Sequence, residues 1–239
     1  MSRIVAVLVR ESMAAAAPEG ADRRAFLEAI AEDTYEMVAG LELVTPILVT
    51  SVPDLDHILW PGTEIVNISE RATLREILVL VAAKLDLHSN RVAQIGTGED
   101  HVHAGRSEHD GRDDHADLGD DADRAEPVDQ IAVVAADAPD LPPLLIGKMF
   151  RELGRALLAV CPAENGGAVA LAVTLPLPEW AEPDLDTPDL VTALRAQAPG
   201  RRMVATTPGW HRLHTPDDLA RLDPGLEGWD NTRAFTRAE

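Results

Sequence analysis

The chain has 239 residues, of which 46% are hydrophobic, and a formal net charge of −20. Because so acidic a surface lacks the basic face that a nucleic-acid backbone requires, we expect no nucleic-acid partner. A free nucleotide can still bind if a metal ion neutralises its phosphates. The apolar run near the N-terminus is only about six residues long, too short for a signal peptide or a membrane span. We therefore expect a cytoplasmic protein with no membrane partner. A single cysteine, Cys161, excludes an intramolecular disulfide and is expected to be a small buried hydrophobic residue.

The first half of the chain predicts strands that alternate with helices. Apolar runs of strand length cover residues 4–9, 46–51 and 64–68. Apolar residues recur at helical spacing over 22–39, where Gly40 ends the pattern, and over 73–87. A short helical turn is expected over 54–59. In the second helix, the residues expected to be buried are Leu74, Ile77, Leu78, Leu80 and Val81.

An acidic segment, residues 96–127, separates the two halves. It holds eleven acidic residues and three arginines and has almost no large apolar residue, so we expect a disordered insertion. Its four histidines are His101, His103, His109 and His115. Imidazole and carboxylate groups can bind a transition metal, but the spacing is irregular and no rigid element fixes it, so a solvated acidic loop is the favoured interpretation.

The second half predicts further strands and helices. Strands are expected over 131–136, 156–161, 168–175 and 202–205. Helices are expected over 142–153 and 189–198, and a third begins at Thr215, before a proline and two aspartates. Strands alternating with helices predict an α/β fold, a three-layer α/β/α sandwich with a mostly parallel central sheet. We expect one domain over 1–226 and a frayed tail over 227–239.

The strand predicted over 131–136 ends directly in carboxylates. Asp137 and Asp140 follow it, and Pro139 stops the strand. Ligands bind just past the carboxyl ends of strands in open α/β sheets, and a carboxylate there can hold a divalent cation against phosphate oxygens. The alternative is that Asp137 only caps the turn or the next helix. Asp184 and Asp186 form a similar pair, but no strand precedes them, so we interpret them as caps of the following helix.

Three motifs in chain order carry a family resemblance: VVAADAPDLPP, CPAENGG and W-x-x-x-H-T-P-D-D-L. Together they resemble the nucleotidyltransferase and glycosyltransferase superfamily with the GT-A fold. The nearest relatives are similar to arsenosugar-biosynthesis glycosyltransferases, with phospholactate guanylyltransferases further away. The resemblance implies that Asp137 is the ligand of a divalent cation, Mg²⁺ or Mn²⁺, that bridges to the nucleotide's phosphates, and that Asp137 and Asp140 form the catalytic motif.

The second motif implies an acceptor-side binding site. Its residues are Glu164, Asn165, Gly166 and Gly167. Paired glycines let a backbone approach a ligand closely, but an Asn-Gly pair is equally a strong signal for a hairpin between the two neighbouring strands. Trp210, which opens the third motif, is expected to flank a pocket.

The chain departs from the family pattern at two places. Arg212 and His214 stand where the third motif carries two aspartates, so a metal site of Asp137 and His214 would favour Mn²⁺ or a softer ion. The loop after the first strand, which holds phosphates in the family, retains Arg10 as its one basic residue and lacks a glycine nest. Arg71 and Arg75 are the remaining cations nearby.

Two functions follow from this pattern. The first is a metal-dependent transferase that moves a nucleotidyl or glycosyl group from a nucleotide or nucleotide sugar to a small-molecule acceptor. The alternative is a catalytically inactive scaffold that binds a protein partner or a second copy of the chain. Loss of the phosphate loop is the feature that separates them. An acidic metal-buffering protein is a third and less favoured interpretation.

Overall fold

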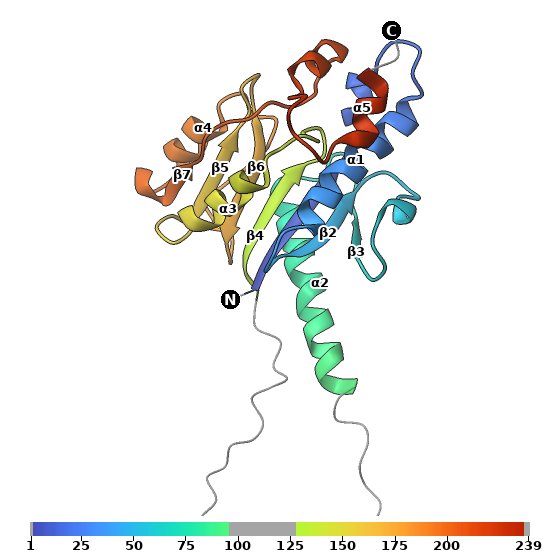
Figure 1. Ribbon diagram of the computed structural model, residues 1–239. Helices are drawn as coiled ribbons and strands as arrows, with labels where there is room; N and C mark the ends of the chain where they lie inside the picture. Colours follow the sequence, from blue (N-terminus) through green and yellow to red (C-terminus); the bar gives the residue numbers. More distant parts are fainter. Residues whose placement is uncertain (1, 96–127, 237–239) are drawn as a thin grey trace, which may run out of the picture.

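The structure, a computed structural model, describes residues 2–95 and 128–236 (Figure 1). The acidic segment 96–127 lies outside the described residues, and so do its four histidines. The predictions made for this segment therefore concern residues that the structure does not describe. Among the described residues, no helix combines the length and the apolar character needed to cross a membrane.

Seven strands form one mixed sheet, in the order β3-β2-β1-β4-β6-β5-β7. Their bounds are β1 Ser2–Val9, β2 Thr45–Thr50, β3 Glu64–Asn67, β4 Val128–Ala135, β5 Leu158–Pro162, β6 Ala168–Thr174 and β7 Val204–Thr206. All neighbouring pairs are parallel except those that involve β6, which runs antiparallel to both β4 and β5. The sheet is therefore mostly parallel, as the sequence predicts.

Strand β1 lies where the order of the strands reverses. Helix α1 (Arg23–Ala39) connects β1 to β2 on one side, and helix α2 (Leu74–Ile95) connects β3 to β4 on the other. Because both crossovers are right-handed and run in opposite directions, the two helices cover opposite faces of the sheet, which gives three layers. The carboxyl ends of β1 and β4 consequently meet at the switch point where ligands bind in open α/β sheets.

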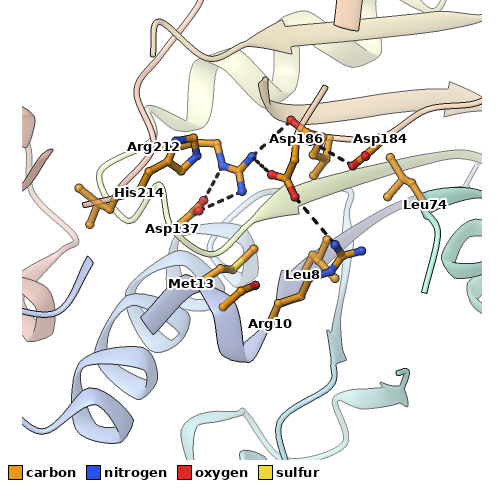
Figure 2. Close-up of a pocket in the computed structure, with 12 residues that line it drawn as sticks. Leu8, Arg10, Met13, Leu74, Asp137, Asp184, Asp186, Arg212 and His214 are labelled. Carbon is orange, nitrogen blue, oxygen red and sulfur yellow. Dashed lines mark hydrogen bonds and ion pairs between the residues drawn. The ribbon is translucent and has the colours of Figure 1, made fainter. Parts of the chain in front are cut away.

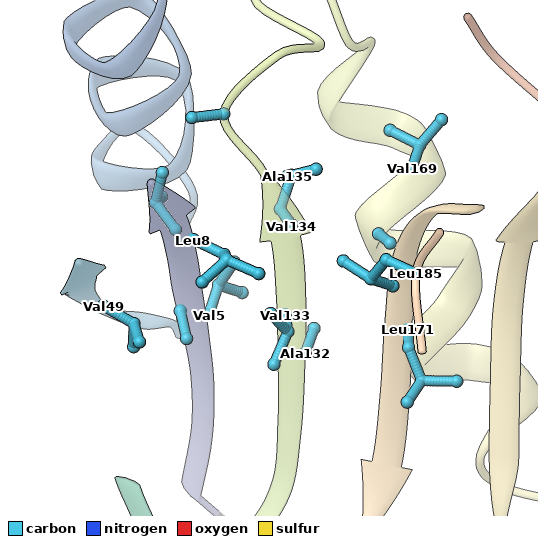
Figure 3. Close-up of a cluster of buried hydrophobic side chains, with 14 of the residues drawn as sticks. Val5, Leu8, Val49, Ala132, Val133, Val134, Ala135, Val169, Leu171 and Leu185 are labelled. Carbon is cyan, nitrogen blue, oxygen red and sulfur yellow. The ribbon is translucent and has the colours of Figure 1, made fainter. Parts of the chain in front are cut away.

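The core surrounds β1 and β4, whose side chains are buried on both faces of the sheet. Val5, Val7, Val133 and Val134 have no exposed surface. Figure 3 shows side chains of β1 and β4 packed beside Leu171 of β6. Each fully buried valine or leucine contributes about 1.5–3 kcal/mol, so these strands fix the positions of the residues at their ends.

The helices largely follow the predicted pattern. Asp22 caps α1 by accepting hydrogen bonds from the backbone N–H groups of Arg24 and Ala25. Helix α3 covers Pro143–Glu152, α4 covers Leu190–Gln197, and the segment after Thr215 is the 3₁₀ helix η4, Pro216–Arg221, which begins with a capping box. Leu80 of α2 was expected in the core but is 45% exposed. It lies outside the stripe of Leu74, Ile77, Leu78 and Val81, which recur at i, i+3, i+4 and i+7.

The C-terminus forms a docked helix where the sequence predicts a frayed tail. Helix α5, Asp230–Thr236, lies against α1, with the ring of Phe235 5.4 Å from that of Phe26 in an edge-to-face contact. The buried carboxylate of Asp33 accepts hydrogen bonds from the N–H groups of Asn231 (3.2 Å) and Thr232 (2.7 Å). Burial raises the pKa of Asp33 even though these hydrogen bonds oppose the shift. The prediction failed because this cap joins residues 198 positions apart.

Candidate functional site

A small cleft of about 170 Å³ opens at the carboxyl ends of β1 and β4 (Figure 2). Arg10 reaches it from the end of β1, Asp137 from the end of β4, and Arg212 and His214 from the segment before η4. The rest of its polar lining is Asp184 and Asp186, from the loop between β6 and α4, and Ser12, from the segment after β1. The sequence placed Arg10, Asp137 and His214 in the site, named Arg212 only as a departure from the family motif, and interpreted Asp184 and Asp186 as helix caps.

Asp137 forms a buried ion pair with Arg212. Both side chains are nearly inaccessible, at 2% and 4% exposure. Arg212 donates from Nε to Oδ1 (2.8 Å) and from Nη2 to Oδ2 (2.9 Å), the bidentate geometry that makes arginine–carboxylate pairs strong. The backbone carbonyl of Asp137 also accepts a hydrogen bond from Leu213 N–H at 2.7 Å. The carboxylate therefore holds an internal cation, and no helix-capping bond from its side chain is found among the described residues.

Arg212 also binds the loop between β6 and α4. Its Nη1 donates to Oδ1 of Asp186 (2.8 Å) and to the backbone carbonyls of Leu185 (3.3 Å) and Ala168 (3.4 Å). Burial alone would lower the pKa of Arg212, but the two carboxylates raise it above its ordinary value. The prediction that Asp184 and Asp186 cap α4 is wrong, because Asp189 caps this helix by accepting from Thr192 N–H.

Arg10 approaches Asp186 from the opposite side. Its Nη1 lies 4.0 Å from Oδ2 of Asp186, and its Nη2 donates to the backbone carbonyl of Ala72 at 2.7 Å. The buried Nε of Arg10 has no hydrogen-bond partner among the described residues. One exposed carboxylate, Asp186, thus bridges two arginines that are themselves largely buried.

A second carboxylate occupies the loop after β1. The N–H groups of Glu11 and Ser12 both donate to Glu70, each at 3.1 Å, and the hydroxyl of Ser51 donates to the same carboxylate. Burial alone would raise the pKa of Glu70, but these hydrogen bonds lower it below its ordinary value. Sequence reasoning missed Glu70 because it searched the segment for cations and glycines. The backbone amides of the loop after β1 are therefore occupied by an internal anion.

A larger cavity adjoins the cleft on the β2 side. It has a volume of about 820 Å³, and its polar lining comes from Glu11, Ser12, Arg23, Arg24, Ser51 and Glu70. Ser12 lines both spaces, so they meet at the loop after β1. The larger cavity lies within the range of about 300–1,000 Å³ that is typical of small-molecule pockets, whereas the cleft is smaller than this range.

Asp140 and Trp210 do not line the cleft. The buried carboxylate of Asp140 accepts from Trp210 Nε1 (3.0 Å) and from the N–H of Asp223 (2.9 Å), and His211 Nε2 lies 3.0 Å from Oδ1. The indole of Trp210 stacks on the His211 ring with a centroid distance of 4.8 Å. Asp140 therefore holds residues 210–223 at the end of β4. Because its side chain does not line the cleft, no contact supports its predicted catalytic role.

The CPAENGG segment forms the turn of the β5–β6 hairpin, one of its two predicted alternatives. Glu164 is exposed, while Asn165 donates to the backbone carbonyl of Arg212 at 2.8 Å. Gly166 and Gly167 both have positive φ, and a Cβ on Gly167 would lie 2.4 Å from the carbonyl oxygen of Leu185. The four residues predicted to bind the acceptor lie outside the cleft lining, and two of them position Arg212 and the segment before Asp186.

The predicted divalent-metal site of Asp137 and His214 does not fit this arrangement. Both oxygens of Asp137 accept hydrogen bonds from Arg212, and His214 is an exposed residue at the mouth of the cleft. Among the described residues, no group of three histidines, cysteines or acidic residues is placed to hold a metal ion. A cation bound to Asp137 would have to displace the guanidinium or lie beside it against charge repulsion.

Comparison with known proteins shows the fold. No family model and no curated protein matches the sequence. A solved structure of a proposed nucleotide-diphospho-sugar transferase from Desulfovibrio desulfuricans is 15% identical, with a TM-score of 0.59 over 99% of this chain and 98% of that chain. A 4-diphosphocytidyl-2C-methyl-D-erythritol synthase from Anaerococcus prevotii is 10% identical, with a TM-score of 0.53 over 99% of both chains. The chain has the α/β fold of these proteins, and the predicted fold class is confirmed.

Proposed function

We propose that the cleft binds the phosphates of a nucleotide or nucleotide sugar and that the protein transfers a nucleotidyl or glycosyl group to a small-molecule acceptor. The observation that carries the proposal is the convergence of Arg10 and Arg212 on one anion at the switch point of the sheet. The names of the two structural neighbours, a sugar transferase and a cytidyl compound synthase, support the same class of chemistry. The adjoining cavity would hold the nucleoside or sugar.

Each cleft residue has a separate part in this proposal. Arg10 and Arg212 orient the phosphate group and stabilise the negative charge that grows on it during transfer. Asp137 fixes the guanidinium of Arg212, and Asn165 fixes its backbone. His214, at the open mouth of the cleft, is placed to accept a proton from an acceptor hydroxyl.

An inactive scaffold is the second candidate, and a specific observation favours it. Two carboxylates of the chain already bind the donors that would otherwise bind phosphates. Glu70 accepts hydrogen bonds from the backbone amides after β1, and Asp186 forms ion pairs with Arg10 and Arg212. In this case the cleft holds its loops together, and the protein acts through a protein partner or a second copy of itself.

A thermal-shift titration with nucleoside triphosphates and nucleotide sugars separates the two candidates. Each donor is tested with Mg²⁺, with Mn²⁺ and with EDTA, on the wild type and on Arg10→Met. A donor at about 100 times its Kd stabilises the protein by about 2.7 kcal/mol. Stabilisation of the wild type that is weakened in Arg10→Met supports the transferase and identifies the donor.

Two further measurements complete the test. Asp217→Asn changes an exposed acid outside the cleft, so it should respond to every donor as the wild type does. Release of pyrophosphate or nucleoside diphosphate in the presence of candidate acceptors then reports transfer itself. If no donor at millimolar concentration shifts the melting temperature, the transferase proposal is contradicted and the scaffold remains.

A further inference from the structure

We propose that this cleft binds a phosphate or pyrophosphate group without a divalent cation, and that the carboxylate of Asp186 is an internal occupant that the phosphate displaces. The inference rests on the proposed function in that it specifies how the phosphates would be held. Its observations are the ion pair of Asp137 with Arg212 and the bridging position of Asp186 (Figure 2).

The positive charge beside Asp137 is the guanidinium of Arg212, a residue of the chain itself. Arg212 makes two short hydrogen bonds to Asp137, and guanidinium groups stay protonated throughout the physiological pH range. A metal ion on Asp137 would therefore either break this pair or lie beside the guanidinium against its positive charge. Arginine binds phosphate oxygens through several donors at once, so a guanidinium can take over charge neutralisation in such a cleft.

Asp186 is the partner that can leave. Its side chain is 58% exposed, whereas Arg212 is 4% and Arg10 17% exposed. An ion pair with a solvent-exposed carboxylate is weak, because water restores most of the lost interaction when the pair opens. The buried pair with Asp137 has no such replacement, so opening the cleft would leave Arg212 in place.

The charge balance predicts what takes the place of Asp186. The four residues joined by these ion pairs, Arg10, Arg212, Asp137 and Asp186, are together neutral, so departure of Asp186 leaves one positive charge among them, which the exposed lining residue Asp184 offsets only across the cleft. It also removes the shortest hydrogen bond of Arg212 Nη1, which keeps longer ones to the carbonyls of Leu185 and Ala168, and it frees Nη1 of Arg10. Beside Arg10 Nη1 lies the buried Nε of the same residue, which has no partner among the described residues. These donors face one point from two sides, and a tetrahedral phosphate offers several acceptors to them, whereas a carboxylate offers two oxygens.

Isothermal titration with inorganic pyrophosphate in EDTA tests the inference. We expect the wild type to bind, Asp186→Asn to bind about tenfold more tightly, and Arg10→Met to bind about tenfold more weakly. The factor of ten is the loss in apparent affinity when an internal occupant fills the site about 90% of the time. Asp217→Asn removes the same charge from an exposed position outside the cleft and should bind as the wild type does.

The inference is overturned if pyrophosphate binds only when Mg²⁺ or Mn²⁺ is added, or if Asp186→Asn binds no more tightly than Asp217→Asn. Arg10 and Asp186 are chosen because neither forms part of the buried pair, and a circular dichroism melt verifies that each variant is folded. Pyrophosphate binding that behaves as expected while no nucleotide binds would support this site and contradict the transferase. Nucleotides that bind only with metal would support the transferase and contradict this site.

Discussion

Removal of either partner of the Asp137–Arg212 pair should destabilise the fold by unequal amounts. Arg212→Met leaves a carboxylate that is 2% exposed without its two donors. Breaking a buried pair in this way costs about 3–5 kcal/mol. Asp137→Asn should cost about 3 kcal/mol, the lower end of that range, because Arg212 keeps Asp186 and the carbonyl of Leu185 as partners.

The double variant Asp137→Asn/Arg212→Met tests whether the cost arises from an unpaired charge. It leaves neither a buried cation nor a buried anion, and exchange of a whole buried pair for neutral groups is often nearly neutral. With a coupling energy of about 2–3 kcal/mol, we expect the double variant to lie within about 1 kcal/mol of Arg212→Met alone, whereas additive effects would place it about 3 kcal/mol lower. Urea unfolding at pH 7, followed by circular dichroism, gives all four free energies of unfolding. Additive single effects would refute the reasoning.

Three further predictions concern residues outside the cleft. The pKa of Asp33 is raised in the folded state, so above pH 3.8 the folded state binds more protons than the unfolded state until the pH passes the raised pKa. The stability of the wild type relative to Asp33→Asn should therefore fall as the pH rises through this window. Urea unfolding midpoints of both proteins from pH 3.5 to 7 measure this. Burial raises the pKa of the Cys161 thiol to about 11, so the native protein should resist iodoacetamide at pH 8 and react when unfolded; modification of the folded protein within minutes would contradict it. Gly167→Ala should cost about 1–3 kcal/mol more than Gly166→Ala in thermal unfolding, since both have positive φ but only Gly167 faces a backbone oxygen, that of Leu185.

The sequence predicted the strands and the position of Asp137, but not what Asp137 binds. An apolar run that ends in Pro139 and two aspartates defines the end of a buried strand by local rules alone. The partner of Asp137 is 75 positions away, and its identity depends on how residues 210–215 return to the sheet. For the same reason the sequence showed Arg212 only as a departure from the family motif, and the structure showed that its guanidinium binds the Asp137 carboxylate.

Asp186 and Glu70 illustrate a second limit of sequence reasoning. Acidic residues in loops are usually solvated or cap helices, so neither position differs in sequence from an ordinary surface acid. Their roles arise because the ends of β1 and β2 lie side by side and because the β5–β6 hairpin brings Leu185 next to Gly167. Each role is a property of the assembled sheet.

The buried guanidinium also constrains how this site could change over evolutionary time. A change to an acidic residue at position 212 in a single step would place a new carboxylate beside Asp137 and remove the cation that both Asp137 and Asp186 share. Such an intermediate would carry at least one unpaired buried charge and lose about 3–5 kcal/mol, a large share of the stability of an ordinary domain. A change from an arginine-based cleft to a metal-based cleft therefore requires several substitutions at once, because the single substitutions destabilise the fold. Positions 137 and 212 should consequently vary as a pair among descendants of this chain.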